Sequence, residues 1–204
     1  MKIIFLDNDG VICLSNNWGG RFKKFKEYQK GNPTIEFIND KSIPVEYRFD
    51  NFDTKAIKVL NEILEITGAE IVVSSDWKKH ATLEELGDYY ESKGIIKRPI
   101  AVTELFAAKA TDWDTSGFMP KGFPWLRYDQ LEQERHFEIL HWLKEHPEVT
   151  HWVAVDDLNM GKEIHTRYGD ETRDWGLTNF VWTPREDEGI KQSGVKEKII
   201  KFLE

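Results

Sequence analysis

The sequence predicts an α/β fold in which a central parallel sheet is covered on both faces by helices. Short segments that are apolar throughout alternate along the chain with longer segments whose apolar residues recur at helical spacing. Strands that lack apolar–polar alternation are typical of parallel sheets, because both of their faces are buried. The apolar segments are residues 3–6, 70–73, 151–155 and 179–182. We expect them to be strands of one sheet.

Helical periodicity occupies much of the chain between and after these strands. The segments that show it are residues 54–66, 82–92, 135–144 and 195–203. Two longer stretches, at about residues 14–53 and 98–134, lack clean periodicity and contain many loop-forming or aromatic residues. We interpret them as insertions, or caps, within a single domain over residues 1–204, because no linker divides the chain.

The composition is that of an ordinary globular chain with an acidic balance. The 204 residues carry a net charge of −8, and 40% of them are hydrophobic. Broad adhesion to nucleic acid or to anionic membranes depends on lysine and arginine, so the balance argues against such adhesion as the main activity. It does not exclude a nucleic-acid end as a substrate. One basic cluster, which we interpret as the solvated face of a helix, comprises Arg21, Lys23, Lys24 and Lys26.

Neither a membrane segment nor a disulfide framework is expected. No apolar stretch approaches the length that spans a bilayer, so we expect a cytoplasmic protein without membrane association. Cys13 is the single cysteine, and we interpret it as a small buried residue rather than a nucleophile. No obligate protein partner is evident from the sequence.

Two carboxylates, Asp7 and Asp9, follow the first apolar segment directly. Because side chains alternate along a strand, Asp7 and Asp9 can point to the same side while Asn8 points away. Carboxylates so close repel each other unless a cation lies between them or one is protonated. Either arrangement is useful in catalysis, through Mg²⁺ or a general acid. The alternative is a plain polar turn, because Asp, Asn and Gly are favoured there.

Later strands also end in polar residues. Ser74 follows the second apolar segment, and Asp156 and Asp157 follow the third. The carboxyl ends of parallel strands meet at one edge of a sheet, where ligands of such folds bind. Four carboxylates in one crevice require a cation, and hard oxygen ligands without a Cys or His cluster favour Mg²⁺. The convergence therefore favours a reaction centre over a turn.

These motifs, taken in order, resemble those of the haloacid dehalogenase (HAD) superfamily. The first is Asp-Asn-Asp-Gly-Val at residues 7–11, and the others are Ser74, a basic residue and the pair Asp156-Asp157. The resemblance covers residue 2 to about 160 and implies a Rossmann-like three-layer core with small cap insertions. A closer likeness, carried by residues 67–77 and by Arg135 with the helix after it, is to the small HAD phosphatase domains of RNA repair.

The resemblance implies a role for each matching residue. Asp7 is expected to be the nucleophile that forms an aspartyl-phosphate, and Asp9 the general acid and base. Ser74 and Arg135 complete the expected catalytic group. The expected phosphate-binding residues are Asn8, Gly10, Ser74, Ser75 and Arg135. The expected Mg²⁺ ligands are Asp7, Asp9, Asp156 and Asp157.

Several assignments stay open on the sequence alone. Ser75 competes with Ser74, which is favoured because it directly follows the apolar run. Lys109 and Lys121 also precede the acidic pair and compete with Arg135 as the cation that neutralises phosphate. Which residue of the acidic pair contacts metal directly is not decided.

The expected function is that of a Mg²⁺-dependent phosphomonoesterase, a HAD-type phosphatase acting on a nucleotide or a polynucleotide end. The alternatives are a phosphatase of small sugar or organic phosphates and a non-catalytic binding module with the same fold. A phospho-acceptor receiver domain fits less well, because its acidic pair precedes the acceptor aspartate. Neither a P-loop nor a dinucleotide-binding glycine motif is present, so kinase and dehydrogenase functions are unsupported.

Overall fold

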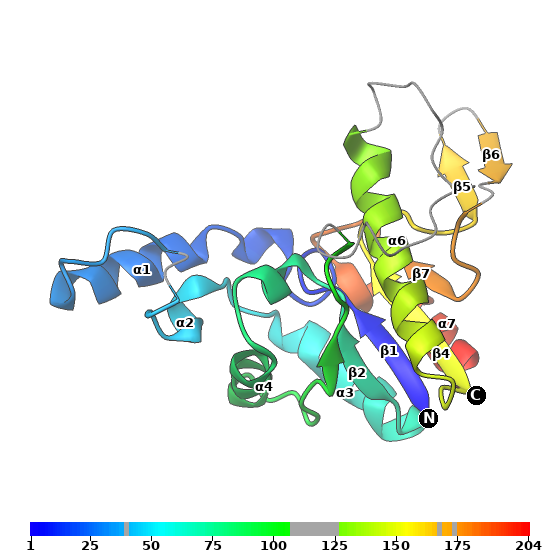
Figure 1. Cartoon of the computed structure of the whole chain (residues 1–204), viewed down its shortest axis with the longest axis horizontal. Coiled ribbons are helices and arrows are strands. Elements are labelled where there is room, and N and C mark those ends of the chain that lie inside the picture. The colour runs from blue at the N-terminus through cyan, green and yellow to red at the C-terminus, as the bar shows by residue number, and fades with distance from the viewer. Residues whose placement is uncertain (39–40, 107–126, 167–168, 173–174) are drawn as a thin grey trace.

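The computed structural model of the chain describes residues 1–38, 41–106, 127–166, 169–172 and 175–204. Its central sheet has five strands in the order β3-β2-β1-β4-β7, and every neighbouring pair is parallel (Figure 1). The strands are β1 (Lys2–Leu6), β2 (Glu70–Val73), β3 (Ala101–Val102), β4 (His151–Asp156) and β7 (Phe180–Trp182). The four apolar segments identified in the sequence are thus all strands of one parallel sheet, and the α/β prediction is confirmed.

Helices cover both faces of the sheet and form the outer layers of the three-layer core (Figure 1). Ile4 and Leu6 of β1 pack into one buried cluster, together with residues of α3 (Thr54–Thr67), α4 (Leu83–Ser92) and α7 (Val195–Leu203). Ile3 and Phe5 point to the other face and pack against α6 (Arg127–Glu145). This alternation explains why β1 is apolar at every position.

Local sequence signals set the ends of the helices that were predicted. The Asp53 side chain accepts a 2.8 Å hydrogen bond from the N–H of Ala56 and begins α3, which ends at Gly68 with φ of +68°. Thr82 and Glu85 form a reciprocal capping box at the start of α4.

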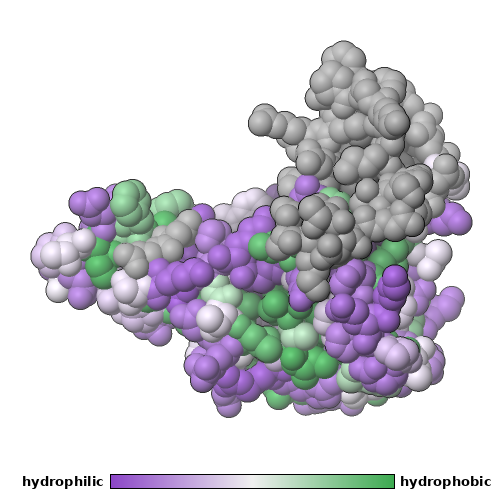
Figure 2. All heavy atoms as spheres, viewed as in Figure 1, coloured by the Kyte–Doolittle hydropathy of each residue, from purple (hydrophilic) through white to green (hydrophobic). Residues whose placement is uncertain are grey.

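The first insertion, residues 14–53, contains more helix than we expected. It holds η1 (Ser15–Asn17), the twelve-residue α1 (Gly20–Gly31) and α2 (Val45–Arg48). Together α1 and α2 form an arm that stands clear of the sheet, and Phe22 and Phe37 are exposed on it (Figures 1 and 2). The prediction of an irregular segment was wrong because α1 is stabilised from a distance. The Asp50 carboxylate accepts hydrogen bonds from the N–H groups of Gly19 (3.1 Å) and Arg21 (2.6 Å).

The second insertion, residues 98–134, is also more regular than predicted. It contributes β3 to the sheet edge, and α6 begins at Arg127 rather than at residue 135. Lys109 and Lys121 lie outside the described residues. After β4 the chain forms an antiparallel hairpin, β5 (Glu163–Thr166) and β6 (Gly169–Thr172), which the sequence did not indicate.

Two further expectations concern membranes and the cysteine. Among the described residues, no helix is both long enough and apolar enough to cross a bilayer. Cys13 is fully buried, and burial raises the pKa of its thiol, as expected for a structural residue rather than a nucleophile.

Candidate active site

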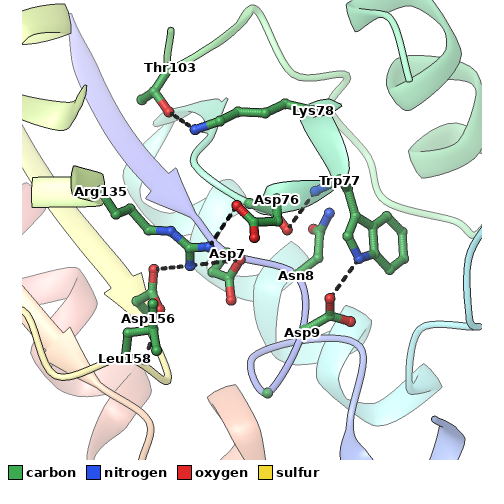
Figure 3. Close-up of polar contacts among 12 residues, drawn as sticks. Asp7, Asn8, Asp9, Asp76, Trp77, Lys78, Thr103, Arg135, Asp156 and Leu158 are labelled. Carbon is green, nitrogen blue, oxygen red and sulfur yellow. Dashed lines mark hydrogen bonds and ion pairs between the residues drawn. The ribbon is translucent and has the colours of Figure 1, made fainter. Parts of the chain in front are cut away.

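The carboxyl ends of β1, β2 and β4 meet at one edge of the sheet, where the expected site lies (Figure 3). The hydrogen bonding between β1 and β4 continues one residue beyond β1, because the N–H of Asp7 donates to the carbonyl of Val155 (3.1 Å). On the β2 side, the N–H of Ser74 donates to the carbonyl of Leu6 (3.0 Å). Asp7 is therefore held at the centre of this edge with only 3% of its surface exposed.

A tight turn follows Asp7. The carbonyl of Asn8 accepts hydrogen bonds from the N–H groups of Val11, Ile12 and Cys13. Gly10 has φ of +67°, a conformation that favours glycine. A Cβ atom at Gly10 would lie 2.3 Å from Oδ2 of Asp157, so the absence of a side chain lets this carboxylate approach the turn.

Two of the predicted phosphate-binding residues, Asn8 and Gly10, make hydrogen bonds within or behind this turn. The side chain of Asn8 is fully buried, and its Oδ1 accepts a 2.5 Å hydrogen bond from the hydroxyl of Tyr90. The N–H of Gly10 donates to the carbonyl of Cys13 (2.9 Å). Both residues therefore shape the turn. The backbone N–H of Asn8 faces the Asp7 carboxylate and stabilises its charged form.

Three carboxylates converge at the sheet edge. Oxygen atoms of Asp7, Asp156 and Asp157 all lie within 4.8 Å of one another. Burial raises the pKa of Asp7 to about 7, and burial together with the charges of Asp7 and Asp156 raises the pKa of Asp157 to about 9. Burial also raises the pKa of Asp156. The cluster is thus crowded with like charge and favours a cation in its midst.

Arg135, on α6, brings positive charge to this cluster. Its Nη1 lies 2.8 Å from Oδ2 of Asp156 and 3.2 Å from Oδ1 of Asp7, and its Nη2 lies 3.5 Å from Oδ1 of Asp76. Burial works against the charged guanidinium, but Asp156 and Asp7 raise the pKa of Arg135 well above its ordinary value. The predicted basic residue thus joins the ends of β1 and β4.

Asp9 lies on the other side of Asp7. Its Oδ2 accepts a 2.8 Å hydrogen bond from Nε1 of Trp77, in the short helix η2 (Asp76–Lys79) (Figure 3). Burial, and then the charge of Asp7, raise the pKa of Asp9 to about 6. Asp9 lies outside the three-carboxylate cluster, which leaves its side chain available for proton transfer.

The structure places Ser75, rather than Ser74, beside the cavity. Ser75 lines the cavity in front of Asp7, and an interaction with the Ser75 hydroxyl lowers the pKa of Asp7, opposing the effect of burial. Ser74 is 1% exposed and is not among the residues that line this cavity. The strand end itself is occupied by Ser74, but the hydroxyl next to the nucleophile position is that of Ser75.

A cavity of about 290 Å³ opens onto these groups. Asp7, Asp9, Ser75, Arg135 and Asp157 line it, as the sequence predicted for a common site. Other lining residues were not predicted, and they include Asp76, Lys79, Glu134 and Glu138. Their only signal was position: Asp76 directly follows Ser75, Lys79 comes three residues later, Glu134 precedes Arg135, and Glu138 lies about one helical turn after it.

The three-carboxylate cluster has the composition expected of a Mg²⁺ site. Asp7, Asp156 and Asp157 offer hard oxygen ligands, and Arg135 is an ion-pair partner of two of them, Asp7 and Asp156. The close approach of Asp157 to Gly10 keeps this carboxylate turned toward Asp7. The side chain of Asp9 is directed to Trp77 instead, so an Asp9 contribution to the metal would come from its backbone carbonyl.

Comparison with known families yields one match. The model of the family described as the HAD domain in Swiss Army Knife RNA repair proteins matches residues 3–179. No curated protein matches, and no solved structure does. The matched range includes β1, β2, β4 and α6, and all the residues of the carboxylate cluster and Arg135 lie within it.

Proposed function

We propose that this chain, which belongs to the family of HAD domains in Swiss Army Knife RNA repair proteins, is a phosphomonoesterase that acts through an aspartyl-phosphate. The family supports a HAD-type phosphatase in general. The observation that carries the finer assignment is the position of Arg135, whose guanidinium bridges Asp7 and Asp156 beside the cavity. A cation placed there can neutralise a phosphoryl group as it reaches Asp7.

Asp7 and Asp9, the two aspartates after β1, have different roles in the proposed reaction. A carboxylate oxygen of Asp7 attacks phosphorus, and the bond from phosphorus to the leaving oxygen breaks as the new O–P bond forms. The Asp9 carboxyl group gives its proton to the leaving oxygen. Asp9 then takes a proton from water, which attacks phosphorus and releases Asp7 with inorganic phosphate. The pKa of about 6 at Asp9 suits a group that must both donate and accept a proton near neutral pH.

The supporting groups position the phosphoryl group. Ser75 donates a hydrogen bond to it from the side of β2, and Arg135 provides positive charge from α6. Asp7, Asp156 and Asp157, with the backbone carbonyl of Asp9, would hold Mg²⁺. When bound, Mg²⁺ supplies charge that offsets the oxygens of the transferring group.

The proposed substrate is a phosphate at the end of a nucleotide or polynucleotide. The family description, which names RNA repair, supports a nucleic-acid end over a small sugar or organic phosphate. A panel of mononucleotides, sugar phosphates and oligonucleotides phosphorylated at either end would rank these substrates by kcat/KM. Preference for sugar phosphates over every nucleotide substrate would overturn the assignment.

Asp7→Asn tests the chemistry directly. We expect it to abolish phosphate release from 4-nitrophenyl phosphate while the fold is kept, because the change relieves repulsion in a crowded carboxylate cluster. The control is Asp187→Asn, which alters an exposed surface carboxylate. Chelation of divalent cations should inactivate the wild type, and added Mg²⁺ should restore it. Full activity of Asp7→Asn would disprove the proposal.

A further inference from the structure

The strand β7 forms one edge of the sheet, and α7 packs beside it (Figure 1). A second and larger hollow lies along these two elements. This groove has a volume of about 810 Å³, and its walls come from β7, α7 and the segment after β4. None of its lining residues takes part in the chemistry proposed above. We call it the β7 groove.

The β7 groove is basic, although the whole chain is acidic. Three lysines line it, Lys162, Lys198 and Lys201, against one acidic residue, Glu163. All three lysines are exposed, and none has an ion pair with any residue that the structure describes. Their ammonium groups are therefore free to meet an anionic ligand. In a chain of net charge −8, such a local excess of positive charge favours a polyanion over a neutral ligand.

Aromatic side chains lie among these lysines. Phe180, Trp182 and Phe202 line the groove, and each is half-buried, so part of each ring remains accessible. Aromatic surfaces next to positive charge are the combination that binds single-stranded nucleic acid, because bases stack on the rings while lysines neutralise the backbone. A simple phosphate site has no need of such rings.

The catalytic cavity and the β7 groove are lined by consecutive residues of the segment after β4. Asp157 and Leu158 line the cavity, and the next residue, Asn159, lines the groove. Nε1 of Trp182 donates a 2.9 Å hydrogen bond to the carbonyl of Asp157, which fixes the indole directly behind the carboxylate cluster. Trp182 is thus the aromatic residue of the groove that is bonded directly to a residue lining the cavity.

We propose that the β7 groove binds the nucleotides adjoining the terminal phosphate of a single-stranded nucleic acid. The inference rests on the proposed phosphatase function, which places the reacting end of the nucleic acid in the catalytic cavity. Lys198 and Lys201 contact the backbone, and Trp182 and Phe180 stack on bases.

The basic cluster on α1 is the competing surface, and the structure favours the groove over it. Lys24 donates hydrogen bonds to the carbonyl of Phe49 (2.6 Å) and to Oδ1 of Asn51 (3.3 Å), so it holds the arm to its own base. Phe25 is buried, and exposed aromatic surface on α1 comes from Phe22. The arm also carries exposed rings, Phe22 and Phe37, so the α1 control variant described below decides between the two surfaces.

The test measures binding of a fluorescein-labelled ten-nucleotide single-stranded RNA by fluorescence anisotropy. Lys198→Ala/Lys201→Ala should weaken binding on the order of tenfold at about 0.1 M salt, and should lower the slope of log K against log salt by about 1.4. Alanine is favourable in helices, so α7 should be kept. The matched control, Lys23→Ala/Lys26→Ala, removes the same charge from the exposed face of α1 and should leave the affinity unchanged.

Three results would overturn the inference: equal affinity of the groove variant and the wild type, a greater loss in the α1 control, or binding of inorganic polyphosphate as tight as that of RNA. Failure of the groove inference can be distinguished from failure of the proposed phosphatase function by comparing two substrates. The groove variant should keep wild-type kcat/KM on 4-nitrophenyl phosphate but lose about tenfold in kcat/KM on a phosphorylated oligonucleotide. An inactive wild type would refute the proposed phosphatase function. The anisotropy measurement would still show whether the groove binds RNA.

Discussion

Nε1 of Trp77 donates a 2.8 Å hydrogen bond to Oδ2 of Asp9, and it joins the proposed general acid to an aromatic cluster. The Trp77 ring is 5% exposed and stacks on Phe49 (centroids 4.2 Å apart) and on Phe52 (5.2 Å). Phe49 and Phe52 belong to the end of the first insertion. The orientation of Asp9 thus depends on how the end of the first insertion packs against η2.

Removing this hydrogen bond should affect substrates according to their leaving group. We expect Trp77→Phe, which keeps an aromatic ring, to lower kcat on an alkyl phosphate such as glycerol phosphate roughly tenfold, because the leaving oxygen must be protonated. The nitrophenolate of 4-nitrophenyl phosphate leaves without protonation, so its kcat should change much less. Trp18→Phe is the control, since it removes an indole N–H that donates to the Cys13 carbonyl (3.1 Å). Equal losses on both substrates would argue for a purely structural role of Trp77.

Gly10 is required for two separable reasons, its positive φ and its contact with Asp157. Gly10→Ala should lower the free energy of unfolding by about 1 kcal/mol from backbone strain, and crowding of Asp157 should weaken Mg²⁺ binding and phosphatase activity in addition. Gly68→Ala isolates the first effect, because Gly68 has φ of +68° and no atom within 4 Å of an added Cβ. Calorimetry would give both Mg²⁺ affinity and thermal stability. If the two variants have the same Mg²⁺ affinity, the contact with Asp157 has no role in metal binding.

Lys78 and Glu138 form a buried ion pair, with side chains 3% and 7% exposed, next to the catalytic cavity. Lys78 also donates to Oγ1 of Thr103 (2.7 Å), and Glu138 accepts from the N–H of Phe106 (3.0 Å). Lys78→Met leaves a buried carboxylate without its cation and should cost about 3 kcal/mol in urea unfolding.

The double variant provides the control for this pair. The free energy of unfolding should fall less in Lys78→Met/Glu138→Gln than the losses of the two single variants added together. We expect a difference of about 1 to 3 kcal/mol, because the double variant leaves no unpaired charge. Strictly additive losses would show that the pair contributes no coupling energy.

His136 should make stability depend on pH. Burial lowers its pKa to about 4, and its Nδ1 has no hydrogen-bond partner among the described residues. Between pH 6.5, the ordinary value, and about 4, the unfolded chain binds this proton and the folded chain does not. The contribution of His136 to stability is therefore complete above this window and falls as the pH is lowered through it, by at most about 3 kcal/mol.

His136→Gln should remove this dependence. The buried carboxylates with raised pKa values act in the opposite direction, because they bind protons more tightly in the folded state. The difference between wild type and variant, followed by urea unfolding from pH 7 to pH 4, isolates the histidine. Parallel stability profiles would contradict a buried neutral imidazole.

Much of the fold was predictable because its signals are local. Apolar runs marked β1, β2, β4 and β7, and a capping aspartate with a terminal glycine marked the ends of α3. β3 was missed because it has only two residues and is defined by its pairing with Val72 and Val73. The extent of α1 was missed, although the basic residues at 21–26 were interpreted as a helix face, because the Asp50 carboxylate that accepts from its first N–H groups lies about thirty positions away in the sequence.

The candidate site, like the fold, was predictable from the sequence only in part. The sequence by itself determined the residue types and the strand ends: the carboxylates of Asp7, Asp9, Asp156 and Asp157 follow apolar runs whose parallel packing leaves them one edge to share. Only the tertiary structure decided which groups meet there. It turned Asn8 toward Tyr90, placed Ser75 rather than Ser74 in the cavity and joined Trp77 to Asp9.

The physical reason is the range of the interactions involved. A run of apolar residues specifies a buried strand through its own side chains, so it can be recognised within a few positions of the sequence. Side-chain direction at the strand ends depends on hydrogen bonds between segments far apart in the chain, such as Arg135 with Asp7 and Asp156. Those contacts exist only after the sheet has brought its strand ends together.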